Sequence, residues 1–172
     1  MQVLGDNHVS HVKVARAYHN IGDARYCQLD LEGACLMHEK SLAIFLEVLG
    51  PNHPNVADAY NALGNVCKAR GQFPEAREHY EKSKEIRIEA RGLDHVDVAG
   101  SYANIGLVFQ EMGSYDLALD LLEQSLEILV RALSEDHPRV VQVVDWIVEL
   151  RIQRELRTLH EKAALVNQDT RS

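Results

Sequence analysis

Three side chains with catalytic chemistry share one face of the first predicted helix. His19, Asp23 and Cys27 follow one another at intervals of four residues, which places them on the same side of a helix. A thiol, an imidazole and a carboxylate can together form an activated nucleophile. Side chains aligned along a single helix face rarely converge on one substrate atom, however. We therefore expect no catalytic residue here and predict that the protein is not an enzyme.

Four histidines resemble a metal-ligand set but are spaced too regularly to form one. His11, His53, His95 and His137 lie 42 residues apart, and each begins a similar motif (HVKVA, HPNVA, HVDVA and HPRVV). Histidines stacked one repeat apart cannot share an ion whose bonds are about 2 Å long. His8 and His11 are candidates for adventitious metal binding only. We therefore predict no specific metal site. We also predict no cofactor, because no P-loop or dinucleotide fingerprint is present.

Composition and charge disfavour further classes of protein. The 172 residues include 18 Lys and Arg against 26 Asp and Glu, a formal net charge of -8. A nucleic-acid partner is not expected, because that function needs a basic surface. No run of about 18 apolar residues occurs, so no membrane segment is expected. The 3 cysteines are odd in number and lack CxxC spacing, which argues against a disulfide framework and for a cytoplasmic protein.

The 42-residue spacing extends to many other positions and defines an internal repeat. Agreement in three periods at so many positions is the strongest signal in the chain. The in-phase sets include Tyr18, Tyr60 and Tyr102; Gly22, Gly64 and Gly106; Ala34, Ala76 and Ala118; Glu39, Glu81 and Glu123; Ser41, Ser83 and Ser125; and Ile44, Ile86 and Ile128.

Each period has the pattern of a helix, a turn and a second helix. In the second period Val56, Tyr60 and Leu63 recur at three and four residues, as on one face of a helix, and Gly71 then breaks the pattern. Pro54 fits the first helical turn, where its missing N–H is tolerated. We predict first helices near 12–27, 54–69 and 96–111, and second helices near 32–48, 74–91 and 116–133.

A glycine recurs inside each first helix, where it costs about 1 kcal/mol relative to alanine. The same loss at Gly22, Gly64 and Gly106 implies a packing reason. Without a Cβ atom, the paired second helix can approach closely. We expect each glycine to meet the in-phase alanine of that second helix, such as Ala76 in the second period.

These residues resemble the tetratricopeptide repeat. The motif YxxLGxxC at 60–67, followed by AxxxY at 76–80, is similar to that signature. The long period, with LGPNHP at 49–54, resembles the repeats of kinesin light chains. The resemblance implies an all-α, right-handed α-solenoid of antiparallel helix pairs. It would contain three full repeats, near 11–49, 53–91 and 95–133.

The two ends of the array depart from the repeat pattern. We expect a capping helix near 138–165, apolar on one side and polar on the other, and a frayed tail at 166–172. Residues 1–5 look like the end of a preceding second helix. The chain would then be a single solenoid over 1–172, a shortened array or the tail of a longer one. Its uncapped N-terminal repeat could form a homo-oligomer.

The resemblance also implies where a ligand would bind, because first helices line the concave groove of such arrays. Asparagine amides both donate and accept hydrogen bonds, so they could pair with the backbone of an extended peptide. Tyr26 and Lys68 would add side-chain selectivity. The alternative is that the asparagines are merely solvated or structural. The candidate groove residues are His19, Asn20, Asp23, Tyr26, Asn61, Asn65, Lys68, Asn104 and Gln110.

The predicted function is a non-catalytic, adaptor-like scaffold that binds a peptide segment of a partner protein. Asp23, Asp145 and Glu149 favour a neutral or basic ligand. A clamp for a C-terminal carboxylate is disfavoured, because only Arg16 and Lys68 are basic nearby. The alternative function is a structural or self-associating fragment of a longer array with no ligand of its own.

Overall fold

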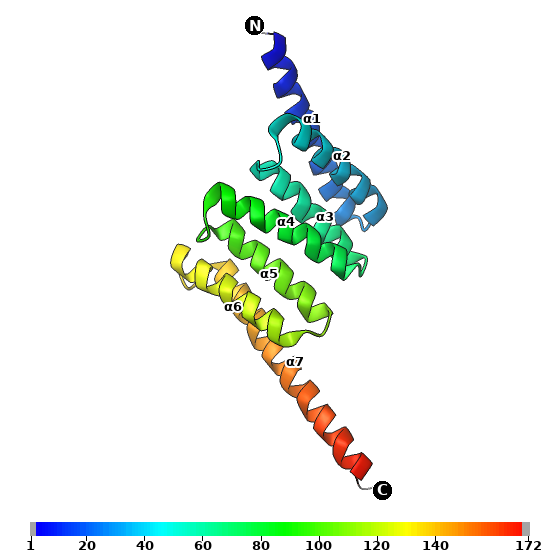
Figure 1. The fold of residues 1–172 in the computed structure, drawn as a ribbon, viewed down its shortest axis with the longest axis vertical. Coiled ribbons are helices and arrows are strands. Elements are labelled where there is room, and N and C mark those ends of the chain that lie inside the picture. Colours follow the sequence, from blue (N-terminus) through cyan, green and yellow to red (C-terminus); the bar gives the residue numbers. More distant parts are fainter. Residues whose placement is uncertain (1–2, 170–172) are drawn as a thin grey trace.

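The chain folds into consecutive α-helices. A computed structural model describes the backbone of residues 3–169 and the side chains of residues 9–164. Within that part, seven helices and no strand are present, which confirms the all-α prediction (Figure 1). The helices are α1 (Val3–Cys27), α2 (Leu31–Leu49), α3 (Pro54–Ala69), α4 (Phe73–Arg91), α5 (Val96–Glu111), α6 (Tyr115–Ala132) and α7 (Pro138–Asp169).

The helices form three antiparallel pairs and a terminal helix, as predicted. The pairs are α1 with α2, α3 with α4, and α5 with α6, and each pair packs on the next along the chain (Figure 1). The terminal helix α7 packs on α6. Helices α3 and α5 have the predicted bounds, and each second helix begins one residue earlier than predicted. Helical periodicity is a local property, which is why the sequence locates these elements so closely.

Three of the four in-phase histidines cap the helices that they precede. His53, His95 and His137 each accept, through Nδ1, a hydrogen bond from the backbone N–H two residues later at 3.1 Å. That bond satisfies one of the amides left without a partner at a helix start. His11 does not mark a helix start, because it lies inside α1.

The N-terminal end of the array differs from the prediction. Residues 3–5 do not end a preceding helix, since α1 runs without a break from Val3 to Cys27. Gly50 and Gly92 end α2 and α4 at positive φ, three residues before a histidine. Gly5 lies six residues before His11, so the spacing of glycine and histidine that separates the later helices is absent here. Met1 and Gln2 lie outside the described residues.

The interior glycines let the paired helices approach closely. A Cβ atom on Gly64 would lie 2.6 Å from the Tyr80 ring, and one on Gly22 would lie 2.5 Å from the His38 ring. The partner is therefore the residue four positions after the expected alanine. In the third pair a Cβ atom on Gly106 would lie 3.2 Å from both the Ala118 carbonyl and Leu122. The expected alanine partner is thus found only in that pair.

Buried serines add a repeated hydrogen bond within the helix pairs. Ser41 donates to the carbonyl of Ala15 and Ser125 to that of Ala99, both at 2.8 Å. These contacts join in-phase positions of the first and third pairs. The in-phase Ser83 of the second pair is buried without such a partner, so two of the three pairs carry this polar link.

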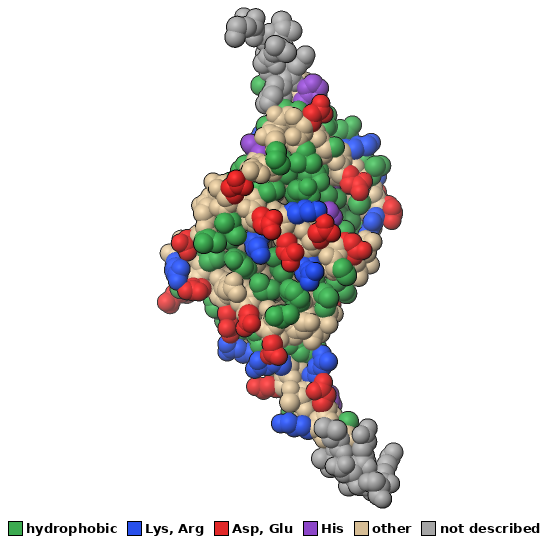
Figure 2. Space-filling view, viewed as in Figure 1, with side chains coloured by type: hydrophobic (Ala, Val, Ile, Leu, Met, Phe, Trp, Pro, Cys, Tyr) green, Lys and Arg blue, Asp and Glu red, His purple; other side chains and the backbone are tan. Residues whose placement is uncertain are grey.

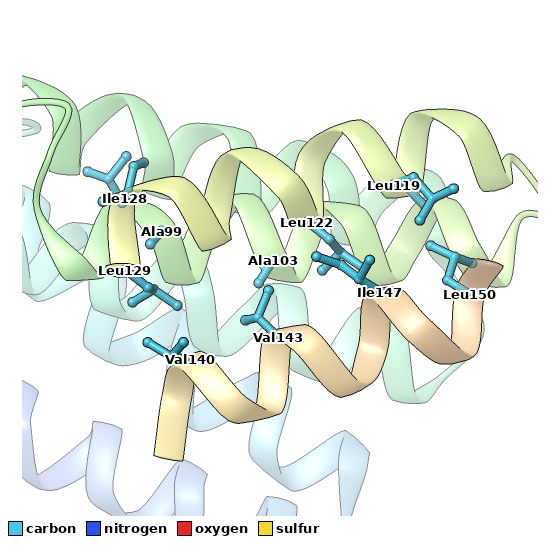
Figure 3. Packing of buried hydrophobic residues seen from close by; sticks show 12 residues of the cluster. Ala99, Ala103, Leu119, Leu122, Ile128, Leu129, Val140, Val143, Ile147 and Leu150 are labelled. Carbon is cyan, nitrogen blue, oxygen red and sulfur yellow. The ribbon is translucent and has the colours of Figure 1, made fainter. Parts of the chain in front are cut away.

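The terminal helix closes the core on one side only. Val140, Val143, Ile147 and Leu150 of α7 are buried against α5 and α6 (Figure 3). The opposite side is not polar as predicted, because six large apolar side chains there are 39–61% exposed. They are Val141, Val144, Val148, Ile152, Leu156 and Leu159.

The end of α7 lies beyond its predicted boundary. The helix continues to Asp169, so residues 166–169 are helical rather than a frayed tail, and 170–172 lie outside the described residues. Glu155 stands where Gly71 and Gly113 end α3 and α5. Without a glycine at that position, the backbone has no left-handed residue to stop the helix. Within the described residues no helix is long and apolar enough to cross a membrane.

We predict that Gly64→Ala destabilises the protein, although alanine is the better helix former. The new Cβ atom collides with the Tyr80 ring, which should lower the unfolding free energy by about 1–3 kcal/mol. Denaturation followed by circular dichroism measures this loss. The control is Gly100→Ala, where the Cβ atom meets only the end of the flexible Arg139 side chain at 3.0 Å. Equal stability of the two variants would contradict the packing role.

Candidate functional site

Two pockets lie on the side of the array formed by the first helices. We call this side, made by α1, α3, α5 and α7, the first-helix face. The first pocket, of about 230 Å³, lies between α1 and α3. Its lining residues are Arg16, His19, Asn20, Phe45, Asn55 and Asp58.

The second pocket lies further along the same face. It has a volume of about 290 Å³, and most of its lining comes from α5 and α7. Asn61 of α3 and Arg87 of α4 close one side. Its other polar or aromatic lining residues include Asp97, Asn104, Arg139 and Trp146.

The two pockets use the same positions of the 42-residue repeat. Phe45 of the first pocket is in phase with Arg87 and Leu129 of the second. Asn55 of the first pocket is likewise in phase with Asp97 and Arg139. The repeat therefore builds a similar hollow at successive places, with different side chains in each.

Arg87 organises the second pocket. Its guanidinium donates to Asp58 Oδ1 at 3.0 Å, to Ser101 Oγ at 3.0 Å and to the Asp97 carbonyl at 3.2 Å. The side chain is only 12% exposed. It therefore ties α4 to both α3 and α5, and its charge is already paired with Asp58.

Arg139 contributes a second cation to this pocket. Its guanidinium donates to the Val96 carbonyl at 3.0 Å, and no carboxylate pairs with it in the described part of the chain. Asp97, in contrast, pairs with Arg91 at 3.1 Å. Gly100 leaves space for the guanidinium, since a Cβ atom there would lie 3.0 Å from Arg139 Nη2. The pocket thus offers one cation that can receive a ligand.

Two of the predicted asparagine anchors bind each other. Asn104 Nδ2 donates to Asn61 Oδ1 at 2.9 Å, between α5 and α3. Both residues line the second pocket. This pairing leaves the Asn61 amide group and the Asn104 oxygen for a ligand.

A third predicted anchor has a structural partner. Tyr80 donates its hydroxyl hydrogen to Asn65 Oδ1 at 2.7 Å. Burial raises the pKa of Tyr80, so the hydroxyl remains a donor. Asn65 lines neither pocket. For Asn65, the alternative interpretation of a structural asparagine therefore fits this contact better than that of a ligand anchor.

Of the other predicted residues, two line the first pocket and three line neither pocket. His19 and Asn20 line the first pocket, whereas Tyr26, Lys68 and Gln110 line neither. Burial lowers the pKa of the half-buried Lys68, with a smaller opposing effect from Glu111. Gln110 donates to Gln153 of α7 at 3.1 Å.

The acidic residues behind the predicted ligand preference also lie elsewhere. Asp145 and Glu149 are exposed on α7 and line neither pocket. Asp23 instead faces His19 and His38, its Oδ2 and Oδ1 atoms lying 3.7 Å from their respective Nε2 atoms. Cys27 is exposed, and no described contact joins it to His19 or Asp23.

Sequence reasoning missed His38, Arg87 and Arg139. Each comes from a position where the other periods carry a different residue type, so residue type alone did not single it out. The repeat register was the available signal: His38 is in phase with Tyr80, and Arg87 with Phe45. Following the second-helix columns as well as the first-helix columns would have found the first two.

Charged side chains elsewhere are mixed rather than segregated. Figure 2 shows acidic and basic side chains scattered among apolar ones on the face that it presents. That face carries no basic stripe of the kind that a nucleic-acid backbone needs.

The paired helices define an α-solenoid, and comparison with protein-family models assigns its family. The tetratricopeptide repeat profile matches residues 13–89 and 61–130, more than half of the chain. The chain therefore belongs to the tetratricopeptide repeat family, whose members are generally non-enzymatic scaffolds. No curated protein sequence matches it.

Solved structures show the same fold. A putative kinesin light chain with TPR-like repeats from Podosopora anserina has a TM-score of 0.73 and 21% identity, covering 92% of this chain and 77% of its own. BtubC (BKLC) from P. vanneervenii also has a TM-score of 0.73 and 21% identity, covering 79% and 54%. The N-terminal domain of stress-induced protein-1 from C. elegans has a TM-score of 0.61 and 24% identity, covering 82% and 97%. The predicted likeness to kinesin light chain repeats is thus confirmed for the fold.

We predict that the Tyr80–Asn65 hydrogen bond stabilises the second helix pair. Tyr80→Phe and Asn65→Ala should each lower the unfolding free energy, with a coupling of about 0.5–1.5 kcal/mol in the double variant. Denaturation of the four proteins measures that coupling. Asn20→Ala, at an exposed position of α1, serves as the control and should change little. Additive losses from the two single changes would show that Asn65 is not held by Tyr80.

Proposed function

We propose that this protein is a non-catalytic scaffold that binds a peptide segment of a partner protein along the first-helix face. The observation that carries the proposal is the use of the same repeat positions in both pockets. A ligand that crosses successive repeats would meet a similar hollow each time. An adaptor role and a cytoplasmic location belong to the proposal. The location rests on the number and spacing of the cysteines.

The spacing of the repeats suits an extended peptide. Packed helices lie about 8–10 Å apart, and an extended chain advances about 3.3 Å per residue. Each repeat would therefore face two or three ligand residues. Asn61 and Asn104 would pair with the peptide backbone through the amide atoms that their mutual bond leaves free.

The charges of the second pocket refine the kind of ligand. Arg87 is paired with Asp58, and Asp97 with Arg91, which leaves Arg139 as the cation available to a ligand. A basic peptide would be repelled there. We therefore favour a neutral peptide with polar side chains, one of which accepts a hydrogen bond from Arg139.

We predict that Arg139→Ala and Asn104→Ala each weaken peptide binding about fivefold, the loss expected for one hydrogen bond. Peptides are first selected from a random display library. Their affinity is then measured by the fluorescence of Trp146, which lines the pocket and is the single tryptophan of the sequence. Asp120→Ala, exposed on α6, is the matched control on a second helix. Affinity that survives both pocket changes would refute binding at this site.

A second candidate function is self-association, and one observation favours it. Val141 and Val148 on the exposed apolar side of α7 are in phase with Ala99 and Gly106 of α5. In the earlier helix pairs, the second helix of the pair covers these repeat positions. The occupant that we propose is α7 of a second copy in antiparallel orientation. The contact proposed here is at the C-terminal helix, whereas the sequence led us to expect it at the N-terminal repeat.

We predict that the mass measured by light scattering rises with protein concentration, and that Val144→Glu with Val148→Glu abolishes the rise. Burying two carboxylates without partners would oppose the helix contact. Both positions are exposed in the single chain, so the fold should tolerate the changes. A wild-type mass that stays at one chain at all concentrations would exclude self-association.

A further inference from the structure

His38 has no equivalent among the other buried side chains of its repeat position. Its in-phase counterparts are Tyr80, which donates a hydrogen bond to Asn65, and Leu122, which is apolar. The His38 side chain is only 1% exposed, yet its Nδ1 atom has no hydrogen-bond partner. Buried polar groups without partners are costly and therefore uncommon. The other ring nitrogen, Nε2, faces Asp23 Oδ1 at 3.7 Å and is the atom that an ion between these side chains would use.

The neighbours of His38 are metal-ligating groups. His19 and Asp23 lie one helical turn apart on α1, and His38 approaches them from α2. Donor atoms from the three side chains all lie within 4.8 Å of one another. The same three residues are thus brought together by one helix pair, although 15 residues separate Asp23 from His38 in the sequence.

The distances fit a shared ion better than direct hydrogen bonds. His19 Nε2 lies 3.7 Å from Asp23 Oδ2, and His38 Nε2 lies 3.7 Å from Asp23 Oδ1. Hydrogen bonds of this kind are about 2.7–3.2 Å long. Two ligands of a tetrahedral zinc ion, with bonds of about 2.0–2.1 Å, lie roughly 3.3 Å apart. The two distances use different oxygens of Asp23, and donor atoms taken one per residue lie within 4.8 Å of one another, so the cluster would contract around an ion.

The site combines a rigid ligand with two that can move. The His38 ring lies directly over Gly22, whose hypothetical Cβ atom would be 2.5 Å from the ring, so it is held by packing. His19 is 22% exposed and Asp23 is 58% exposed, so both can adjust toward an ion. Their exposure also leaves a path from solvent and room for water as a fourth ligand.

We propose that His19, Asp23 and His38 form a binding site for a divalent transition metal ion, with zinc as the expected occupant. Two imidazole nitrogens and one carboxylate oxygen form a ligand set that zinc accepts. Magnesium and calcium prefer shells made of oxygen atoms, so they should bind poorly. His19 also lines the first pocket, which places the ion at the margin of the first-helix face.

This proposal departs from our expectation from the sequence that no specific metal site is present. That expectation considered the four in-phase histidines and the row of residues along α1. Neither set contains His38, because the site needs two helices from different parts of the chain.

Metal titration of the protein tests the proposal. After treatment with a chelator and gel filtration, zinc is added and its binding is followed by calorimetry. Cobalt is used in parallel, since its visible absorption reports tetrahedral coordination. We expect one ion per chain, and no binding of magnesium. A wild-type protein that takes up neither zinc nor cobalt would overturn the proposal.

The chain itself supplies matched variants. His19→Asn, Asp23→Asn and His38→Tyr convert the cluster into its second-repeat counterpart, where Asn65 and Tyr80 pair stably. The triple variant should remain helical and lose metal binding. Asp23→Asn alone, at an exposed position, should weaken metal binding roughly tenfold or more. Loss of a residue that only supports a metal ligand already has an effect of about that size, and Asp23 is a proposed ligand itself. A control variant lacking His8 and His11 should bind as the wild type does. Equal binding by the wild type and the triple variant would place the ion elsewhere and refute the site.

Discussion

The close contact between a helix-interior glycine and a side chain of the paired helix is the constraint on which this structure depends. Each first helix carries that glycine, and His38, Tyr80 and Leu122 lie over the first, second and third of them. A Cβ atom would occupy the space that these side chains fill, so the pair could close only by shifting apart. The closely packed pairs stack along the chain, and the two pockets lie on the side of the stack formed by the first helices.

The same position carries different chemistry in each repeat. Tyr80 satisfies its hydroxyl with Asn65, Leu122 has no polar atom to satisfy, and His38 keeps a buried nitrogen without a partner. The packing requirement is steric, and several large side chains meet it. The array can therefore vary its polar groups without changing its fold, and the binding sites that we propose lie at these differences.

The sequence predicted the helix pairs closely because their signals are local. Periodic apolar residues, turn glycines and histidine caps act within a few residues, so the bounds of α3 and α5 could be read directly. The two ends of the array were harder to predict. Helix α1 begins at Val3 rather than near residue 12, and α7 continues to Asp169 because Glu155 stands where Gly71 and Gly113 follow α3 and α5. Leu29 shows the opposite case, because it adopts a φ of 62° at the turn position where later repeats have glycine.

The sequence by itself determined the repeat, the family and the face on which a ligand was expected. Only the tertiary structure decided which polar side chains on that face are already paired. Asn61 binds Asn104 across 43 residues, and His38 meets Asp23 through the packing of two helices. Such contacts depend on how separate helices approach each other. The repeat pattern predicts which apolar residues pack together, because every period shares those positions. It does not predict which polar side chains pair, because the periods differ at those positions.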